Sequence, residues 1–224
     1  MKFQVIIPAR GGSKRFPRKN IQALNGIPLI CHSILFALKT FPKENIWVNT
    51  DDQEIAGVAA GHGVNITYRP EELGSDTAST ADVLFFQQEL FAQNNIACDA
   101  QILLQATNPL RPENLMTEAI ELFENSGRNS LASFTVLNRK YGKIRMNQYI
   151  PENYKPGQRM QDIDPDYYEN GLIYIAKAQS ILNKEIITGD VFPFIYNGIE
   201  AAVDIDEPTD MLFAEFLLKN KQIL

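Results

Sequence analysis

The sequence has few of the residues on which histidine- and thiol-based sites depend. Of its 224 residues only two are cysteines and two are histidines. Cys31 and Cys98 lie in apolar segments and lack the spacing of metal ligands, so we expect reduced, buried thiols. A histidine-rich metal site and a Ser-His-Asp hydrolase are both poorly supported.

Long apolar runs are also absent. No stretch of about 18 apolar residues could span a bilayer, and the N-terminus enters an apparent strand without a signal segment. We therefore expect a cytoplasmic protein with no membrane partner. With 45% hydrophobic and 21% charged residues, the composition is that of an ordinary globular protein, and a single domain over residues 1–224 is predicted.

Acidic residues are missing from the first 43 positions. That segment carries eight Lys or Arg residues, whereas the rest of the chain has 13 basic and 27 acidic residues and the net charge is −6. Like charges held close together repel unless a partner neutralises them, so this segregation predicts an anionic ligand. A nucleic acid is not expected, because proteins that bind its backbone usually spread positive charge over a wider face.

Five of these basic residues lie in a glycine-containing loop that follows the apolar run 5–7. From Pro8 to Asn20 the loop reads PARGGSKRFPRKN. Gly11, Gly12 and Ser13 can bring backbone N–H groups close to an anion, while Lys and Arg add full charges. The spacing fits neither the Walker pattern nor the dinucleotide fingerprint. The loop is predicted to bind a polyphosphate in another way, with a solvated basic turn as the alternative.

Short apolar runs alternate with amphipathic segments along the chain. Strands are expected at 5–7, 46–48, 64–68, 102–104, 130–137 and 170–174, and helices at 28–40, 53–61, 81–93, 112–124 and 211–219. The alternation predicts an α/β protein with a mostly parallel, doubly wound sheet. Ligands of such sheets bind beyond the carboxyl ends of the strands, where the polar clusters 50–52 and 105–111 fall. The 50–52 cluster, Thr-Asp-Asp, fits a helix cap and a ligand contact about equally well.

A second polar motif lies near the C-terminus, where residues 202–210 read AVDIDEPTD. Alternation along a strand would point Asp204 and Asp206 to one side while Ile205 turns into the core. Two neighbouring carboxylates are unfavourable without a cation, and oxygen ligands beside a polyphosphate suit Mg²⁺, so this pair is predicted to bind the metal. The apolar face of the final helix is expected to consist of Leu212, Phe213, Phe216 and Leu217.

The hydrophobic period disappears between residues 138 and 166. Tyr, Pro, Asn, Lys and Arg dominate this segment. In a compact domain such a stretch indicates a functional excursion or an interface more often than a disordered loop.

The opening loop resembles the signature of the acylneuraminate cytidylyltransferase family, enzymes that make CMP-activated sialic acids and related nonulosonic acids from CTP. Weaker matches follow in the family's order at 69–80 (RPEELGSDTAST), 103–111 (LLQATNPLR) and 170–174 (NGLIY), and the match is complete at 204–215 (DIDEPTDMLFAE). The resemblance implies a Rossmann-like nucleotidyltransferase fold with three α/β/α layers. It also implies CTP and a nonulosonic acid as substrates, Mg²⁺ as cofactor, and a homodimer with 138–169 as a dimerisation insertion.

The resemblance also assigns roles to individual residues. The catalytic group would be Arg10, Lys14, Lys19 and Asp206. The nucleotide would be bound by Ala9, Arg10, Gly11, Gly12, Ser13, Lys14, Lys19, Asn20, Arg69 and Thr80. Gln105, Asn170 and Tyr174 would contact the sugar, Asp204 and Asp206 would hold the metal, and Arg111 would anchor its loop. Lys143 and Arg159 are candidates for reaching a partner's site. Many family members carry Arg where this chain has Tyr168, and the motifs are compatible with sialic, legionaminic and pseudaminic acids.

The reaction implied by the resemblance is attack of the sugar's C2 hydroxyl on the α-phosphate of CTP, with loss of pyrophosphate. A nucleotide-sugar glycosyltransferase is one alternative, because Asp-x-Asp binds a metal and a diphosphate there as well. A non-catalytic nucleotide-binding regulator is another. The basic loop argues against the first, and the presence of both the loop and the aspartate pair argues against the second.

Overall fold

A computed structural model describes residues 1–75 and 77–220 of the chain. At its centre is a seven-stranded sheet in the order β11-β7-β10-β6-β1-β4-β5. The strands are β1 (Phe3–Pro8), β4 (Ile46–Thr50), β5 (Asn65–Tyr68), β6 (Ala100–Leu103), β7 (Ser130–Leu137), β10 (Asp166–Lys177) and β11 (Phe192–Ile195). Within the described sheet β10 alone runs antiparallel to its neighbours. The prediction of a mostly parallel sheet is confirmed.

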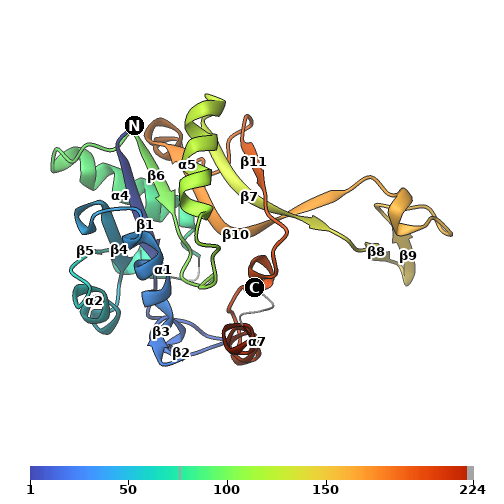
Figure 1. Cartoon of the computed structure of the whole chain (residues 1–224), viewed down its shortest axis with the longest axis horizontal. Helices are drawn as coiled ribbons and strands as arrows, with labels where there is room; N and C mark the ends of the chain where they lie inside the picture. The colour runs from blue at the N-terminus through green and yellow to red at the C-terminus, as the bar shows by residue number, and fades with distance from the viewer. Residues whose placement is uncertain (76, 221–224) are drawn as a thin grey trace.

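Helices cover both faces of the sheet (Figure 1). One face packs against α1 (Leu29–Leu38), α2 (Gln53–Ala60) and α5 (Leu115–Ser126), and the other against α4 (Thr80–Gln93) and α6 (Ala178–Leu182). The alternation of side chains along β1 explains the two layers, because Val5 and Ile7 join the first core while Ile6 joins the second. The expected three-layer α/β/α arrangement is confirmed.

A third apolar cluster lies below the carboxyl ends of the strands. It joins the small hairpin of β2 (Ala23–Leu24) and β3 (Ile27–Pro28) to α7 (Pro208–Lys219). The side chains that α7 buries there are Met211, Ala214 and Leu217. Leu212, Phe213 and Phe216 are instead 67%, 39% and 53% exposed. The predicted apolar face of this helix is therefore wrong except at Leu217.

The segment that carries Asp204 is not a strand. A short 3₁₀ turn (Ile199–Ala202) precedes it, and no sheet pairing is recorded for residues 203–206 in the described chain. A bond from the Ile205 N–H to the carbonyl of Thr107, 2.8 Å long, holds the extended backbone. Ile205 is fully buried and both neighbouring aspartates reach the surface. The predicted strand is wrong, but the predicted alternation of sides is correct.

The aperiodic segment forms an arm that projects from the body of the protein (Figure 1). Strands β7 and β10 lead into it, and it carries the hairpin of β8 (Gly142–Arg145) and β9 (Gln148–Pro151) and a 3₁₀ turn (Met160–Asp162). Apolar side chains are exposed along it, including Ile144 and Met146 at 76% and 99%. None of the described helices is long and apolar enough to cross a membrane.

Candidate functional site

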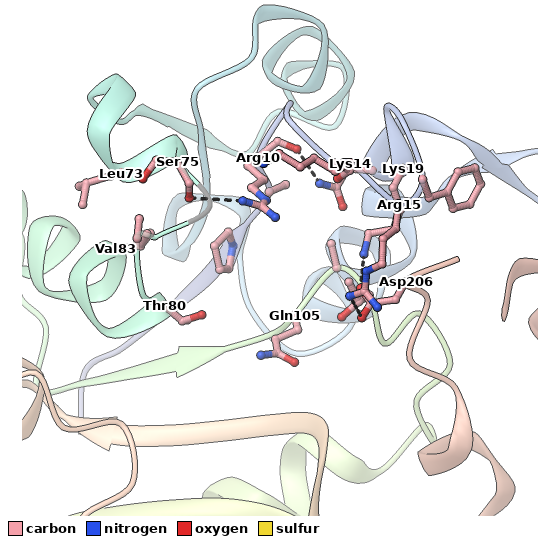
Figure 2. A pocket seen from close by; sticks show the side chains of 18 of the residues that line it. Arg10, Lys14, Arg15, Lys19, Leu73, Ser75, Thr80, Val83, Gln105 and Asp206 are labelled. Carbon is pink, nitrogen blue, oxygen red and sulfur yellow. Dashed lines mark hydrogen bonds and ion pairs between the residues drawn. The ribbon is translucent and has the colours of Figure 1, made fainter. Parts of the chain in front are cut away.

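A pocket of about 390 Å³ opens at the carboxyl ends of β1, β5 and β6. This volume lies within the range of small-molecule sites, about 300–1,000 Å³. The predicted site residues that line it are Ala9, Arg10, Ser13, Lys14, Lys19, Asn20, Arg69, Thr80, Gln105, Asp204 and Asp206. Segments far apart in the sequence thus meet around one cavity, with α3 (Glu71–Gly74) and the start of α4 on one side and Asp206 on the other (Figure 2).

The opening loop is held in place by hydrogen bonds within it and to the end of β4. The Asn20 side-chain amide donates to the Arg10 carbonyl at 2.9 Å, and the backbone N–H of Ala9 continues the sheet with a 3.0 Å bond to Asn49. Gly11 and Gly12 do not line the pocket. The Gly11 N–H donates to Asp51, and a Cβ at Gly11 would lie 2.6 Å from an oxygen of Asp52. Glycine at position 11 therefore lets the loop pack closely against Asp52.

The carboxylate of Asp206 is bound by two cations from the opening loop (Figure 2). Lys19 Nζ lies 2.8 Å from Oδ1, and Arg15 Nη2 lies 2.6 Å from Oδ2. Partial burial by itself would raise the pKa of Asp206, but the charges and hydrogen bonds of Lys19 and Arg15 hold the pKa below its usual value. Lys19 is only 8% exposed, so its ammonium group is largely shielded from water. The sequence analysis assigned no site role to Arg15, although its position in the basic loop could have indicated one.

Asp204 lies beside this ion pair and behaves differently. It keeps contact with solvent, yet the surrounding protein atoms desolvate the carboxylate and raise its pKa, and the charge of Asp206 acts in the same direction. The Thr107 hydroxyl and Lys19 only partly oppose this effect. Within the described chain no group of three or more Cys, His, Asp or Glu side chains could form a metal site by itself. Two carboxylates nevertheless fit Mg²⁺, which takes its remaining ligands from water and substrate phosphates.

Arg69 enters the pocket from the end of β5 with most of its surface covered. The residue is 8% exposed, and its Nη2 donates to Asp51 Oδ1 at 3.1 Å. Its Nε has no hydrogen-bond partner among the described residues. Burial lowers the pKa of Arg69, and the neighbouring Asp51 opposes that shift. Thr80 also lines the pocket and occupies the first turn of α4, which Ser79 caps through a capping box with Asp82.

On the expected sugar side the structure separates three residues that the sequence grouped together. Gln105 lines the pocket, whereas Asn170 and Tyr174 do not. Asn170 is 4% exposed and its side chain is bonded to Ser133 and Thr135 of β7, at 2.5 and 3.0 Å. The Tyr174 hydroxyl donates to Glu169 at 3.2 Å. Burial and then the charge of Glu169 raise the pKa of Tyr174.

Arg111 anchors the loop that carries Gln105. Its guanidinium donates to the carbonyls of Leu172 and Gln105, at 2.7 and 2.8 Å, and to the Ser33 hydroxyl at 3.0 Å. Burial lowers the pKa of Arg111 to about 9. The contacts tie the loop after β6 to α1 and β10, so Arg111 anchors its loop as predicted.

Comparisons with known proteins identify a family and a set of relatives. A family model described as cytidylyltransferase matches residues 4–223. The chain is 34% identical over 229 residues to the CMP-N,N'-diacetyllegionaminic acid synthase of Legionella pneumophila, covering 99% of this chain and 98% of that protein. It is 33% identical over 230 residues to the pseudaminic acid cytidylyltransferase of Campylobacter jejuni, covering 98% and 97%.

Among solved structures, a CMP:2-keto-3-deoxy-manno-octonic acid synthetase complexed with CTP is similar, with a TM-score of 0.71. The match covers 99% of this chain and 100% of that one at 18% identity, so this similarity concerns the fold.

Proposed function

Because the chain belongs to the cytidylyltransferase family, we propose that it joins a nonulosonic acid to CMP, using CTP as donor and releasing pyrophosphate. The observation that carries the proposal is one pocket with a basic loop on one wall and two aspartates facing that loop. The names of two similar proteins specify legionaminic and pseudaminic acids. We therefore propose an acid of this class, with sialic acid as a further member to test.

The proposed reaction needs no covalent enzyme intermediate. The C2 hydroxyl oxygen of the sugar bonds to the α-phosphorus of CTP as the bond to pyrophosphate breaks, and the hydroxyl proton is released. The protein would contribute positioning and charge neutralisation. Arg10, Lys14 and Lys19 would balance the charge that grows on the leaving pyrophosphate. The rest of the pocket's nucleotide side would be Ala9, Ser13, Asn20, Arg69 and Thr80.

Asp204 and Asp206 would hold Mg²⁺. When bound, this ion supplies Lewis-acid stabilisation at the α-phosphate and favours ionisation of the attacking hydroxyl. Asp206 carries two loop cations in the structure. On nucleotide binding Lys19 and Arg15 would exchange that carboxylate for phosphate oxygens.

The proposal places the sugar beside Gln105. Gly171, with φ of +76°, supports this wall, because a Cβ there would lie 2.9 Å from the Gln105 side-chain oxygen. Asn170 and Tyr174 would act behind the wall by holding β10 in position. They would shape the sugar site without lining it.

We also propose a homodimer formed through the 138–169 insertion. Exposed Ile144, Met146 and Tyr149 on the arm give it an apolar surface that a second copy could cover. Lys143 and Arg159 are paired with Glu152 and Asp162 of the same arm. They would have to change partners to reach another chain's sugar site. Because the reaction consumes CTP, we place the enzyme in the cytoplasm, where nucleoside triphosphates are made.

The direct test is to measure pyrophosphate release from CTP with sialic, legionaminic or pseudaminic acid as the second substrate. We expect release only when CTP, Mg²⁺ and one of these acids are present together. A glycosyltransferase would consume a CMP-sugar and not CTP, and a regulator would bind CTP without releasing pyrophosphate. If the protein binds CTP but releases no pyrophosphate with any of these acids, the proposed function is overturned.

A further inference from the structure

Two adjacent aspartates at the end of β4 have separate tasks in the structure. Asp52 is the N-cap of α2, and its Oδ1 accepts from the N–H groups of Glu54 and Ile55 at 2.8 and 2.9 Å. Asp51 makes no such cap. It also does not line the nucleotide pocket. Its role therefore has to be found in what it holds.

Asp51 contacts three segments that surround the pocket. Its Oδ1 accepts from Arg69 Nη2 at 3.1 Å and from the Gly11 N–H at 3.3 Å, which joins the end of β5 to the opening loop. The third contact is with α3, where a Cβ on Gly74 would lie 2.8 Å from Asp51 Cγ and Oδ2. Leu73 and Ser75 on either side of that glycine line the pocket. One carboxylate thus contacts three segments that surround the cavity.

Arg69 is the group most dependent on this contact. It is 8% exposed, and Asp51 is the acidic partner recorded for it in the described chain. A buried guanidinium without a counter-charge is strongly disfavoured, so Asp51 is what keeps this cation folded into the pocket wall. The Arg69 Nε still has no hydrogen-bond partner among the described residues. A nucleotide atom that accepts hydrogen bonds would complete the donor set.

We propose that Asp51 is a positioning residue for nucleotide binding: it orients Arg69 and fixes Gly11, and itself touches no substrate. This inference rests on the proposed function, because it takes CTP as the ligand of the pocket. It assigns to the first aspartate of Thr50-Asp51-Asp52 a role that is neither helix cap nor ligand contact. It also explains why α3 ends in glycine at the point of contact.

The test is the dissociation constant for CTP, measured by calorimetry on the full chain and compared between Asp51→Asn and Asp52→Asn. The two variants lose the same charge at adjacent positions and keep their shape, and Asn is as good an N-cap as Asp. Loss of one charge-assisted bond should weaken CTP binding by about tenfold in Asp51→Asn. Binding in Asp52→Asn should stay within about twofold of wild type, because its cap and its packing against Gly11 remain.

A second pair of variants avoids removing the counter-charge of Arg69. Gly74→Ala places a methyl group against Asp51, whereas Gly57→Ala in α2 has open space around the new methyl group. Gly74→Ala should weaken CTP binding and Gly57→Ala should not. If Asp51→Asn fails to fold, this pair decides the question alone.

A double-mutant cycle with Arg69→Gln separates orientation from general damage. If Asp51 acts through Arg69, Asp51→Asn should have little further effect on CTP binding in the Arg69→Gln background. CTP affinity unchanged in Asp51→Asn and Gly74→Ala, or strictly additive losses in the cycle, would overturn the inference. A wild-type protein that binds no CTP would instead refute the proposed function.

Discussion

Neutralising Asp204 and neutralising Asp206 should have opposite effects on the stability of the apo protein, although both are proposed metal ligands. Asp206→Asn removes the partner of Lys19 and Arg15, whose side chains are 10% and 64% exposed. A charge-assisted bond contributes about 1.5–3 kcal/mol when shielded from water, and an exposed ion pair about 0–1 kcal/mol. Because Asp206 is itself 39% exposed, we expect a loss of about 1–2 kcal/mol for Asp206→Asn, between the exposed and the shielded values.

Asp204→Asn should leave the apo protein at least as stable as wild type. The raised pKa of Asp204 means that the folded state disfavours its charge, so a neutral side chain relieves that cost. For a domain of this size the Asp206→Asn loss corresponds to a fall in Tm of about 2–8 °C. Differential scanning fluorimetry of the two variants without nucleotide or metal measures both effects. Equal falls in Tm for the two variants would refute the assignment of the loop ion pair to Asp206 alone.

The pH dependence of this difference follows from the lowered pKa of Asp206. An acid whose pKa is lowered by folding stabilises the protein above its unfolded pKa and loses that contribution as the pH falls through the folded value. The Tm difference between wild type and Asp206→Asn should therefore be present above pH 3.8 and shrink below it. A difference that grows on acidification would contradict the ion-pair explanation.

Turnover should respond alike in the two variants. Each should lose Mg²⁺-dependent pyrophosphate release by about a hundredfold or more, because metal stabilisation of a phosphoryl transition state amounts to several kcal/mol. Binding of metal-free CTP should persist in Asp206→Asn, since Lys19 and Arg15 lose a competing carboxylate. Wild-type turnover in Asp206→Asn would refute the metal assignment.

Two further predictions concern the loop and the arm. If Lys19 stabilises the departing pyrophosphate, Lys19→Ala should lower both kcat and kcat/KM by about ten- to a hundredfold. Arg18→Ala is the matched control, because Arg18 is paired with Glu54. Equal kcat/KM in both variants at near-physiological salt would show that Lys19 has no such role. Because Leu137 and Asp166 are paired across β7 and β10, residues 138–165 can be replaced by an Asn-Gly turn. The shortened protein should sediment as a monomer that binds CTP but releases no pyrophosphate in response to the sugar. A wild-type chain that is monomeric and fully active would contradict the dimer.

The sequence predicted six of the seven strands of the sheet, because these six contain short apolar runs, and it did not predict β11. Residues 130–137 form a strand with the predicted bounds, and the separation of Ile6 from Val5 and Ile7 follows from simple alternation. The final helix was harder to interpret. Apolar residues lie on several of its sides, so the pattern could not choose between the stripe of Met211, Ala214 and Leu217 and the one that is exposed.

Site residues supplied by β10 were least predictable. Asn170 has the right chemistry for a sugar contact, but hydroxyls of Ser133 and Thr135 on β7 occupy its side chain. These contacts depend on the register of β7 against β10, which shifts between Glu169 and Tyr174. A sequence pattern indicates that a strand exists but does not fix which partner its polar side chains meet.

The charge of the opening loop shows how far composition alone can lead. A basic segment without acids predicts an anion nearby, and the structure provides one in Asp206, 187 residues beyond Lys19. This internal carboxylate does not neutralise the whole site, however. Lys19 and Arg15 occupy both oxygens of Asp206, and the neighbouring Asp204 keeps a raised pKa. Phosphate oxygens on the loop and a cation between the aspartates would relieve both conditions together. Binding of each would then favour binding of the other, as thermodynamic linkage requires.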